Sequence, residues 1–393
     1  MKILKLILKC PLLVLSFLLL IVFRLFHPII RFQICVVGFH RYGHLALEPE
    51  IFLAEQEITK AGHGVFRRSV NIWSLGPKSK QSNRYLASKW KDELTVFPSW
   101  IVGSLHQVGS IFPFLRLAHV SLSITGSMNG LDKTDSHISF SSEELEKGKR
   151  CLAEMGVDPD QPYVCLIVRD GGHYKSKGNI ESSGYELLNF DINDFAGVSE
   201  VLQENGFQVI RMGSGSEQPF TNKPVGVIDY ALSQHRSEFL DVFLAATCSF
   251  AVSTQTGPDA VCMLFRRPVL YVDVTRYSQF FFGSKFATWA PVRLLKNGRV
   301  LNLSEIANSE IAWFKDPNLF LANGITQQKS SSEELKELVR SYIQKNENGL
   351  GENSSAKETV ARGMGERGRV QFGEVTAELA PNADRILGEW VAK

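Results

Sequence analysis

The sequence has few of the features that would point to a metal centre, a disulfide framework or a nucleic-acid partner. Its six cysteines form no C-x-x-C pair, none has a histidine at zinc-ligand spacing, and most lie in apolar runs. We therefore expect reduced, buried thiols in a reducing compartment and no zinc site. The net charge is only +2 over 393 residues, so electrostatics do not favour nucleic acid as the main partner.

The apolar N-terminus also lacks the cleavage site of a cleavable leader. From Pro11 to Phe23, Ser16 is the only polar residue, and basic residues stand on both sides of this run. No small-x-small cleavage site follows. A spanning helix needs about 20 apolar residues, a length that is reached only when the count starts at Leu4. We expect residues 1–31 to form an uncleaved membrane anchor, either spanning or held in one leaflet. A buried helix of a soluble protein is the alternative.

The first expected strand, Phe32–Gly38, leads into a turn without a dinucleotide fingerprint. The turn is not G-x-G-x-x-G, so we assign no dinucleotide site. It carries His40, Arg41 and Gly43, and a helix is expected to begin near Leu45.

Two residues at the start of that helix have the chemistry of an acid–base pair. A histidine with a near-neutral pKa beside a carboxylate suits general acid–base catalysis. We therefore take His44 as the first candidate base and Glu48 as the second. The alternative is that both are solvated loop groups. Pro49 fits the first turn of a helix, which leaves open a helix start later than Leu45.

The second half alternates apolar strands with amphipathic helices. Strands are expected at Tyr163–Val168, Phe207–Ile210, Val225–Ile228 and Phe250–Val252. This alternation predicts an α/β fold with a parallel, doubly wound sheet. A chain of this length also favours two domains. The expected organisation is an anchor over 1–31, an α/β domain over 32–155, a second α/β domain over 156–328, and C-terminal helices with a linker over 329–393.

Polar residues follow the ends of several of these strands. The carboxyl ends of parallel strands meet at one sheet edge, where ligands of open α/β sheets bind. Arginines, hydroxyls and a helix start at such an edge suit a phosphate or a nucleotide diphosphate. The alternative is a tight, well-capped strand–helix connection. Asp170 is a third candidate base at this edge. The donor-binding candidates are Arg169, Arg211, Gly213, Asp229, Ser253, Thr254, Thr256 and Gly257.

Several motifs in this order resemble a bacterial glycosyltransferase family with GT-B architecture, in which two Rossmann-like domains face a cleft. They are H-R-Y-G-H-L-A-L-E-P-E, Y-V-C-L-I-V-R-D-G-G-H-Y, N-F-D-I-N-D-F, Q-V-I-R-M-G, I-D-Y-A and S-T-Q-T-G-P-D. The resemblance covers roughly Cys35 to Leu301. More loosely, the chain is similar to heptosyltransferases, which have a comparable Ser/Thr-Gly turn before a helix.

The resemblance implies a nucleotide-sugar donor held by the C-terminal domain and an acceptor held by the N-terminal domain. His40, Arg41 and Gly43 then belong to the acceptor loop. The acceptor is expected to be an envelope glycan or a lipid-linked glycan. The family resemblance also implies that no metal and no cofactor is needed, and the sequence has no D-x-D at a strand end. The Asp158-Pro159-Asp160 segment lies in an expected turn.

Two other functions fit the same pattern. One is a GT-B-like nucleotide-sugar 2-epimerase, which needs no acceptor. The other is a non-catalytic member that binds a nucleotide or glycan in an envelope assembly complex. We expect the protein to be membrane-associated through its N-terminal helix, with its catalytic domains on the cytoplasmic face, where nucleotide sugars are made.

Overall fold

The computed structural model describes residues 2–62, 68–124, 128–172, 183–213, 216, 218–348 and 354–387. The chain divides into two compact units. Unit 1 comprises residues 1–124 and 137–139, and unit 2 comprises residues 125–136 and 140–393. Residues 173–182, and residues 349–353 within the helices and linker expected over 329–393, lie outside the described residues.

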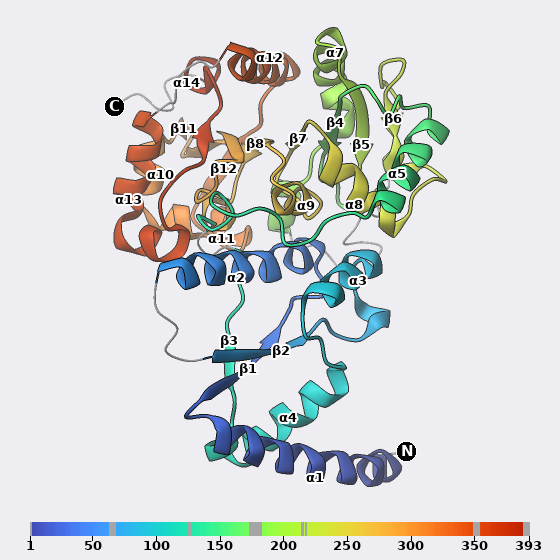
Figure 1. The fold of residues 1–393 in the computed structure, drawn as a ribbon. Coiled ribbons are helices and arrows are strands. Elements are labelled where there is room, and N and C mark those ends of the chain that lie inside the picture. Colours follow the sequence, from blue (N-terminus) through green and yellow to red (C-terminus); the bar gives the residue numbers. More distant parts are fainter. Residues whose placement is uncertain are drawn as a thin grey trace. The chain divides into compact units, whose positions relative to one another are not determined.

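Unit 1 is built around a three-stranded parallel sheet in the order β2-β1-β3. Within this unit, α1 and α4 lie on one side of the sheet, and α2 and α3 lie on the other (Figure 1). Helices thus cover both sides of this parallel sheet (Figure 1). Its elements are α1 (Lys2–Phe26), β1 (Ile30–Val36), α2 (Tyr42–Gly62), β2 (Arg68–Ser74), α3 (Arg84–Glu93), α4 (Ser99–Ile111) and β3 (Ala118–Val120).

The N-terminal helix α1 is part of the core of unit 1 rather than a segment apart from it. Leu20 is fully buried in a cluster with Ile34 of β1 and Leu105 of α4. The Oγ atoms of Ser16 and Ser104 lie 2.7 Å apart in a buried hydrogen bond between the two helices. In the described part of the chain, no helix combines the length and the apolarity that crossing a bilayer requires. The expected spanning anchor is therefore not found.

Helix α2 begins earlier than Pro49 suggests. It starts at Tyr42 and contains Pro49 in its interior. A proline removes the hydrogen bond that its N–H would donate to the carbonyl four residues earlier, here Leu45. The indole Nε1 of the buried Trp90 donates to that oxygen instead, at 2.8 Å. A tertiary contact from α3 thus satisfies the carbonyl that proline leaves without a partner.

Unit 2 contains a seven-stranded sheet in the order β13-β9-β8-β7-β4-β5-β6, and every pairing in it is parallel. A smaller antiparallel sheet, β11-β10-β12, adjoins it in sequence. The strands are β4 (Tyr163–Ile167), β5 (Gln208–Met212), β6 (Ile228–Asp229), β7 (Phe250–Ser253), β8 (Val269–Val274), β9 (Ala287–Pro291), β10 (Arg293–Lys296), β11 (Arg299–Val300), β12 (Ile325–Gln328) and β13 (Glu378–Leu379).

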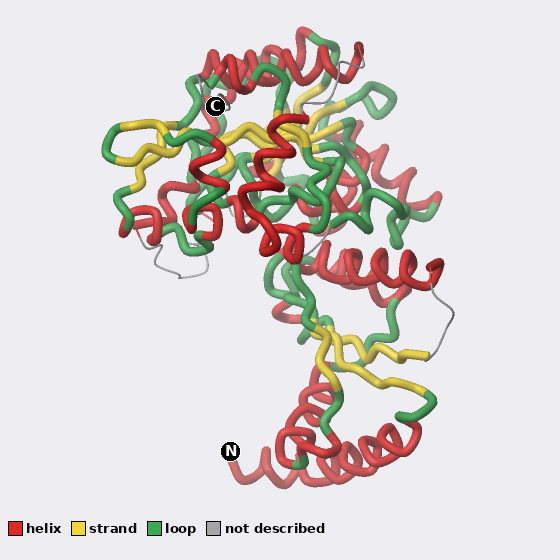
Figure 2. Tube along the Cα trace, turned by 90° about the vertical axis from the view of Figure 1, so that its left-hand side faces the viewer, coloured by secondary structure: helices red, strands yellow, loops and turns green. Residues whose placement is uncertain are grey.

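Helices cover both faces of the large sheet (Figures 1 and 2). Helix α7 contacts β5 and α12 contacts β8, whereas α9 contacts β7 and β8 and packs with α8. The doubly wound arrangement expected from the sequence is confirmed. The helices are α5 (Ser142–Glu154), α7 (Ala196–Glu204), α8 (Glu238–Thr247), α9 (Asp259–Leu264), α10 (Leu303–Ala307), α11 (Asn318–Ala322), α12 (Ser332–Asn348), α13 (Ser354–Phe372) and α14 (Ala383–Ile386).

Helix α5 belongs to unit 2, whereas the sequence placed it at the end of the first domain. Its start is a capping box, in which Ser141 and Glu144 satisfy each other's backbone N–H groups. A Cβ on Gly148 would come within 2.1 Å of the Phe243 ring on α8. The Phe140 ring stacks on Phe265, with centroids 5.4 Å apart. These apolar contacts hold α5 against unit 2.

Candidate functional site

The strand order of unit 2 defines where a ligand is expected. Starting at the first strand, β4, the chain adds β5 and β6 on one side and then β7, β8 and β9 on the other. Ligands of such sheets bind where the order reverses, at the carboxyl ends of the two strands that flank the reversal. Here those strands are β4 and β7. Arg169 follows β4 and Thr254 follows β7, and the Arg169 N–H donates to Thr254 Oγ1 at 2.9 Å.

The turn after β7 is held by one buried carboxylate. Asp259 Oδ2 accepts from Ser253 Oγ at 2.6 Å and from the Thr256 N–H at 2.7 Å. Burial raises the pKa of the Asp259 carboxyl to about 7, although these two hydrogen bonds oppose the rise. Gln255 has a φ of 63°, and its side chain donates to backbone oxygens outside the turn. Ser253 and Thr254 are buried, whereas Thr256 and Gly257 are half-buried.

The hydroxyls of Ser253 and Thr254 therefore hold the turn in shape and do not face solvent. This supports the capping interpretation for these two residues. Thr256 and Gly257 are the part of the turn that a ligand can reach.

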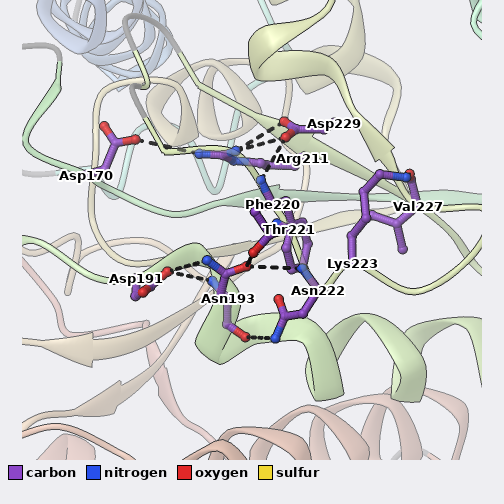
Figure 3. A network of polar contacts seen from close by, with 10 residues as sticks. All are labelled: Asp170, Asp191, Asn193, Arg211, Phe220, Thr221, Asn222, Lys223, Val227 and Asp229. Atoms are coloured by element: carbon purple, nitrogen blue, oxygen red, sulfur yellow. Dashed lines mark hydrogen bonds and ion pairs between the residues drawn. The ribbon is translucent and has the colours of Figure 1, made fainter.

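Arg211 lies in a buried polar network at the ends of β5 and β6 (Figure 3). Its Nη1 donates to both oxygens of Asp229, at 3.0 and 3.2 Å, and its Nη2 lies 3.6 Å from Asp170 Oδ2. The guanidinium is 0% exposed. Among the described atoms, Arg211 Nε and Nη2 make no hydrogen bond, but neither nitrogen reaches the surface.

The expectation that Arg211 touches a diphosphate directly is not supported by this geometry, because two carboxylates compensate its charge away from solvent. The two carboxylates are Asp170, the third candidate base, and Asp229, a donor-binding candidate. Asp229 holds the Phe220 N–H at 3.1 Å as well as Arg211. Asp170 accepts from the Gly172 N–H at 3.2 Å. Gly213 lies beside them, where a Cβ would come within 2.5 Å of Ser216 Oγ.

Residues that the sequence did not single out lie next to Arg169. Its Nε donates to Asn189 Oδ1 at 3.2 Å, and the Lys329 ammonium donates to the Asn189 carbonyl oxygen. Burial lowers the pKa of Lys329, although the Asp273 and Asp194 carboxylates oppose the shift. Lys329 follows β12, 160 positions beyond Arg169, so no local motif could have brought the two together.

In unit 1 the structure brings together the predicted acid–base pair. His44 Nδ1 lies 2.7 Å from Glu48 Oε1, and Glu48 Oε2 accepts the Gly38 N–H at 2.6 Å. Glu48 is 6% exposed and the His44 side chain 27% exposed. The buried carboxylate thus fixes a ring that solvent can reach. A Cβ on Gly38 would come within 2.8 Å of His44 Cβ, so only glycine lets the ring lie there.

The other residues of this loop differ in exposure. His40 and Arg41 are exposed, and the His40 ring lies edge-on to Phe39 with centroids 5.6 Å apart. Gly43 is buried within the first turn of α2. His40 and Arg41 are therefore the two loop side chains that a ligand of unit 1 can reach.

Within the described ranges, no three or more His, Cys, Asp or Glu side chains are grouped to hold a metal ion. Five cysteines are unpaired thiols: Cys151 is half-buried, and Cys35, Cys165, Cys248 and Cys262 are buried.

No protein-family model and no curated protein matches this chain. Solved structures with a similar arrangement include a glycosyl transferase of family 9 from Veillonella parvula. It is 10% identical, with 61% of this chain and 80% of that chain covered and a TM-score of 0.40. E. coli ADP-heptose LPS heptosyltransferase II is 11% identical, with 61% and 84% covered and a TM-score of 0.39.

UDP-GlcNAc 2-epimerase from Methanocaldococcus jannaschii is 13% identical, with 62% and 84% covered and a TM-score of 0.28. Heptosyltransferases, to which the sequence motifs are loosely similar, are thus among these neighbours.

Proposed function

We propose that this protein is a GT-B-like, metal-independent glycosyltransferase that uses a nucleotide-sugar donor. The observation that carries this function is the site at the ends of β4 and β7. There, the Arg169 backbone is tied to Thr254, and the Thr256–Gly257 part of the same turn is half-buried rather than enclosed. A parallel α/β sheet binds nucleotides at such a reversal of strand order. The donor diphosphate is proposed to lie on this turn.

The chemistry asked of this site is stabilisation of a leaving group. When the bond between the sugar and the diphosphate breaks, negative charge develops on the leaving phosphate. Groups already held in place stabilise that charge without reorganisation. Asp259 fixes the backbone of the turn through Ser253 and Thr256. Thr256 Oγ1 is the proposed side-chain donor to the phosphate oxygens. Arg169 is 8% exposed and bonded to Asn189, so it is proposed to contribute positive charge beside the phosphate.

The His44–Glu48 pair of unit 1 supplies the proposed general base. In the proposed tautomer, Nδ1–H of His44 donates a hydrogen bond to Glu48, and Nε2 is the unprotonated nitrogen. In the proposed step, Nε2 takes the proton of the acceptor hydroxyl as the acceptor oxygen bonds to the sugar carbon. The proposed acceptor is a glycan or lipid-linked glycan of the cell envelope, reached at the cytoplasmic face of the membrane.

A thermal-shift panel on the full chain tests the donor site. The panel compares UDP, GDP, CDP, ADP and their nucleotide sugars. We expect the nucleotides of one nucleobase to raise the unfolding temperature of the protein. A ligand about 100-fold above its Kd stabilises by about 2.7 kcal/mol. Thr256→Val keeps the shape of the side chain and is expected to weaken that response. The matched control is Thr326→Val, an exposed strand threonine, which is expected to leave it unchanged.

Turnover separates the remaining functions. Release of nucleoside diphosphate that requires membrane extract supports glycosyl transfer. Conversion of the nucleotide sugar without any acceptor identifies an epimerase instead. Nucleotide binding without turnover identifies a non-catalytic binding protein, and the absence of any nucleotide response overturns the proposed donor site.

A further inference from the structure

Helix α1 has its polar and apolar sides reversed relative to a helix at a water-exposed surface. Between Pro11 and Phe23 it has one polar side chain, Ser16, which is 1% exposed and bonded to Ser104 inside the unit. The opposite side carries only apolar residues, which recur at helical spacing. These are Val14, Leu15, Leu18, Val22 and Leu25, with exposed fractions of 59, 53, 53, 43 and 73%.

A helix that packs on a protein core normally turns polar residues outward. Here a water-facing outer side would leave a row of large aliphatic side chains in solvent, a cost that isolated exposed leucines do not carry. The burial pattern therefore indicates that the outer side of α1 faces a non-aqueous medium.

The end of α4 extends this apolar surface. The Phe112 ring lies edge-on to Phe17 of α1, with centroids 5.0 Å apart, and Phe114 lies 6.1 Å from Phe112. Ile111 and Phe114 are 60% and 65% exposed. We call the exposed residues of α1 named above, together with Ile111, Phe112 and Phe114, the apolar face of unit 1.

Basic residues lie beside the apolar face. An open pocket of about 600 Å³ is lined by His27, Arg31, Pro113, Arg116, Leu117, Ala118 and His119. No acidic side chain lines it. The sequence has no Asp or Glu before Glu48 and none between Glu93 and Asp132, the two segments that supply α1, α4 and the pocket. A polar pocket with this charge next to apolar side chains complements an anionic phosphate at the boundary of a hydrocarbon layer.

We propose that unit 1 docks on a lipid bilayer through its apolar face, with α1 lying in the plane of the interface. The aliphatic and aromatic side chains enter the outer acyl region, and the pocket with Arg31 and Arg116 receives an anionic lipid headgroup. This is a monotopic attachment, in which a helix of the folded core supplies the membrane contact. It stands independently of the proposed transferase activity, because it uses none of the residues of that site.

Vesicle co-sedimentation of the full chain tests this attachment. The probes are vesicles of phosphatidylcholine alone and vesicles of phosphatidylcholine mixed with phosphatidylglycerol. The protein is expected to sediment with the mixed vesicles. Leu18→Glu replaces a leucine proposed to insert into the acyl region with a charged side chain. Partitioning of the protein into the vesicles is therefore expected to fall by about tenfold or more. Val225→Glu alters a side chain of unit 2 that is 97% exposed, and is expected to leave partitioning unchanged.

A separate pair of substitutions tests the headgroup pocket. The double variant Arg31→Gln/Arg116→Gln is expected to lose about tenfold in partitioning to the mixed vesicles and little to phosphatidylcholine alone. Leu25→Glu provides a second apolar variant at a more exposed position. Circular dichroism melts check that each variant is folded, and nucleotide-induced thermal shifts are expected to persist in all of them.

Three outcomes overturn the attachment. The wild-type chain fails to sediment with either vesicle, or Val225→Glu lowers partitioning as much as Leu18→Glu. In the third, light scattering shows a dimer that Leu18→Glu converts to a monomer while vesicles bind neither form. That last result assigns the apolar face to a second copy of the chain.

Discussion

The two units use the carboxyl edges of their parallel sheets in different ways. In unit 1, a buried carboxylate, Glu48, orients a histidine ring that is 27% exposed. In unit 2, the polar side chains at the corresponding strand ends are buried in two separate sets of bonds: Ser253 is bonded to Asp259, and Arg211 is paired with Asp229. Unit 1 thus presents a titratable side chain, whereas unit 2 presents a braced turn.

The comparison teaches that polar residues at a strand end are not equivalent. A side chain that completes an internal network sets backbone geometry, and a side chain held by only one buried partner remains available for chemistry. Substitutions in the buried networks of unit 2 are therefore expected to act mainly on stability, and those at His44 mainly on activity.

The largest expected effect is on the Arg211 network. Arg211→Ala leaves the carboxylates of Asp170 and Asp229 without their counter-charge, and breaking a buried pair costs about 3–5 kcal/mol. Urea unfolding measures the loss. Arg299→Ala is the control, because that guanidinium is 64% exposed beside Glu305 and exposed ion pairs contribute little to stability. Equal losses in both variants would remove the distinction between the two sheet edges.

The next effect is on catalysis in unit 1. His44→Ala is expected to lower turnover by about 100-fold or more, the usual contribution of a general base, with unchanged nucleotide affinity and stability. Turnover with membrane extract measures it, and His235→Ala, on a loop of unit 2, is the control. Wild-type turnover in His44→Ala would remove the histidine from the mechanism.

A smaller effect is expected from displacing the same ring. Gly38→Ala places a methyl group 2.8 Å from His44 Cβ, so the ring shifts and turnover is expected to fall by about tenfold, since small misplacements of catalytic groups are costly. Gly103→Ala is the matched control, because a Cβ at Gly103 would contact nothing within 4 Å. It is expected to keep activity and to gain about 0.5–1 kcal/mol of helix stability. Unchanged turnover in Gly38→Ala would contradict the fixed position of the ring.

The smallest effect is on how stability depends on pH. Burial raises the pKa of Asp259 to about 7 from an ordinary value of 3.8, so the folded state binds more protons than the unfolded state between these values. The contribution of Asp259 to the free energy of unfolding is therefore fully present below about pH 4 and is lost as the pH rises towards 7. Asp259→Asn is expected to flatten this dependence, measured as unfolding midpoints over a pH series.

The matched control for that series is Asp160→Asn, at a side chain that is 84% exposed. Its dependence on pH is expected to follow that of the wild type. If Asp259→Asn kept the wild-type dependence of stability on pH, the pKa of the Asp259 carboxyl would not be raised in the folded state.

The sequence by itself determined the central strands of unit 2 and their parallel pairing, whereas the strand expected at Val225–Ile228 is only Ile228–Asp229 in the structure. The runs at Tyr163–Val168 and Phe250–Val252 are apolar throughout, and a strand buried on both faces needs that pattern. The capping box at Ser141 and the spacing of His44 and Glu48 were also readable, because one helical turn joins the interacting groups.

Only the tertiary structure decided what depends on contacts distant in sequence. The continuity of α2 through Pro49 depends on Trp90, and the environment of Arg169 depends on Lys329. The same holds for the N-terminal helix. Its apolar sequence is compatible with a membrane or a protein core, and the contact between Ser16 and Ser104 shows which side packs on unit 1. Sequence periodicity reports which side chains share a face, but only packing shows what that face contacts.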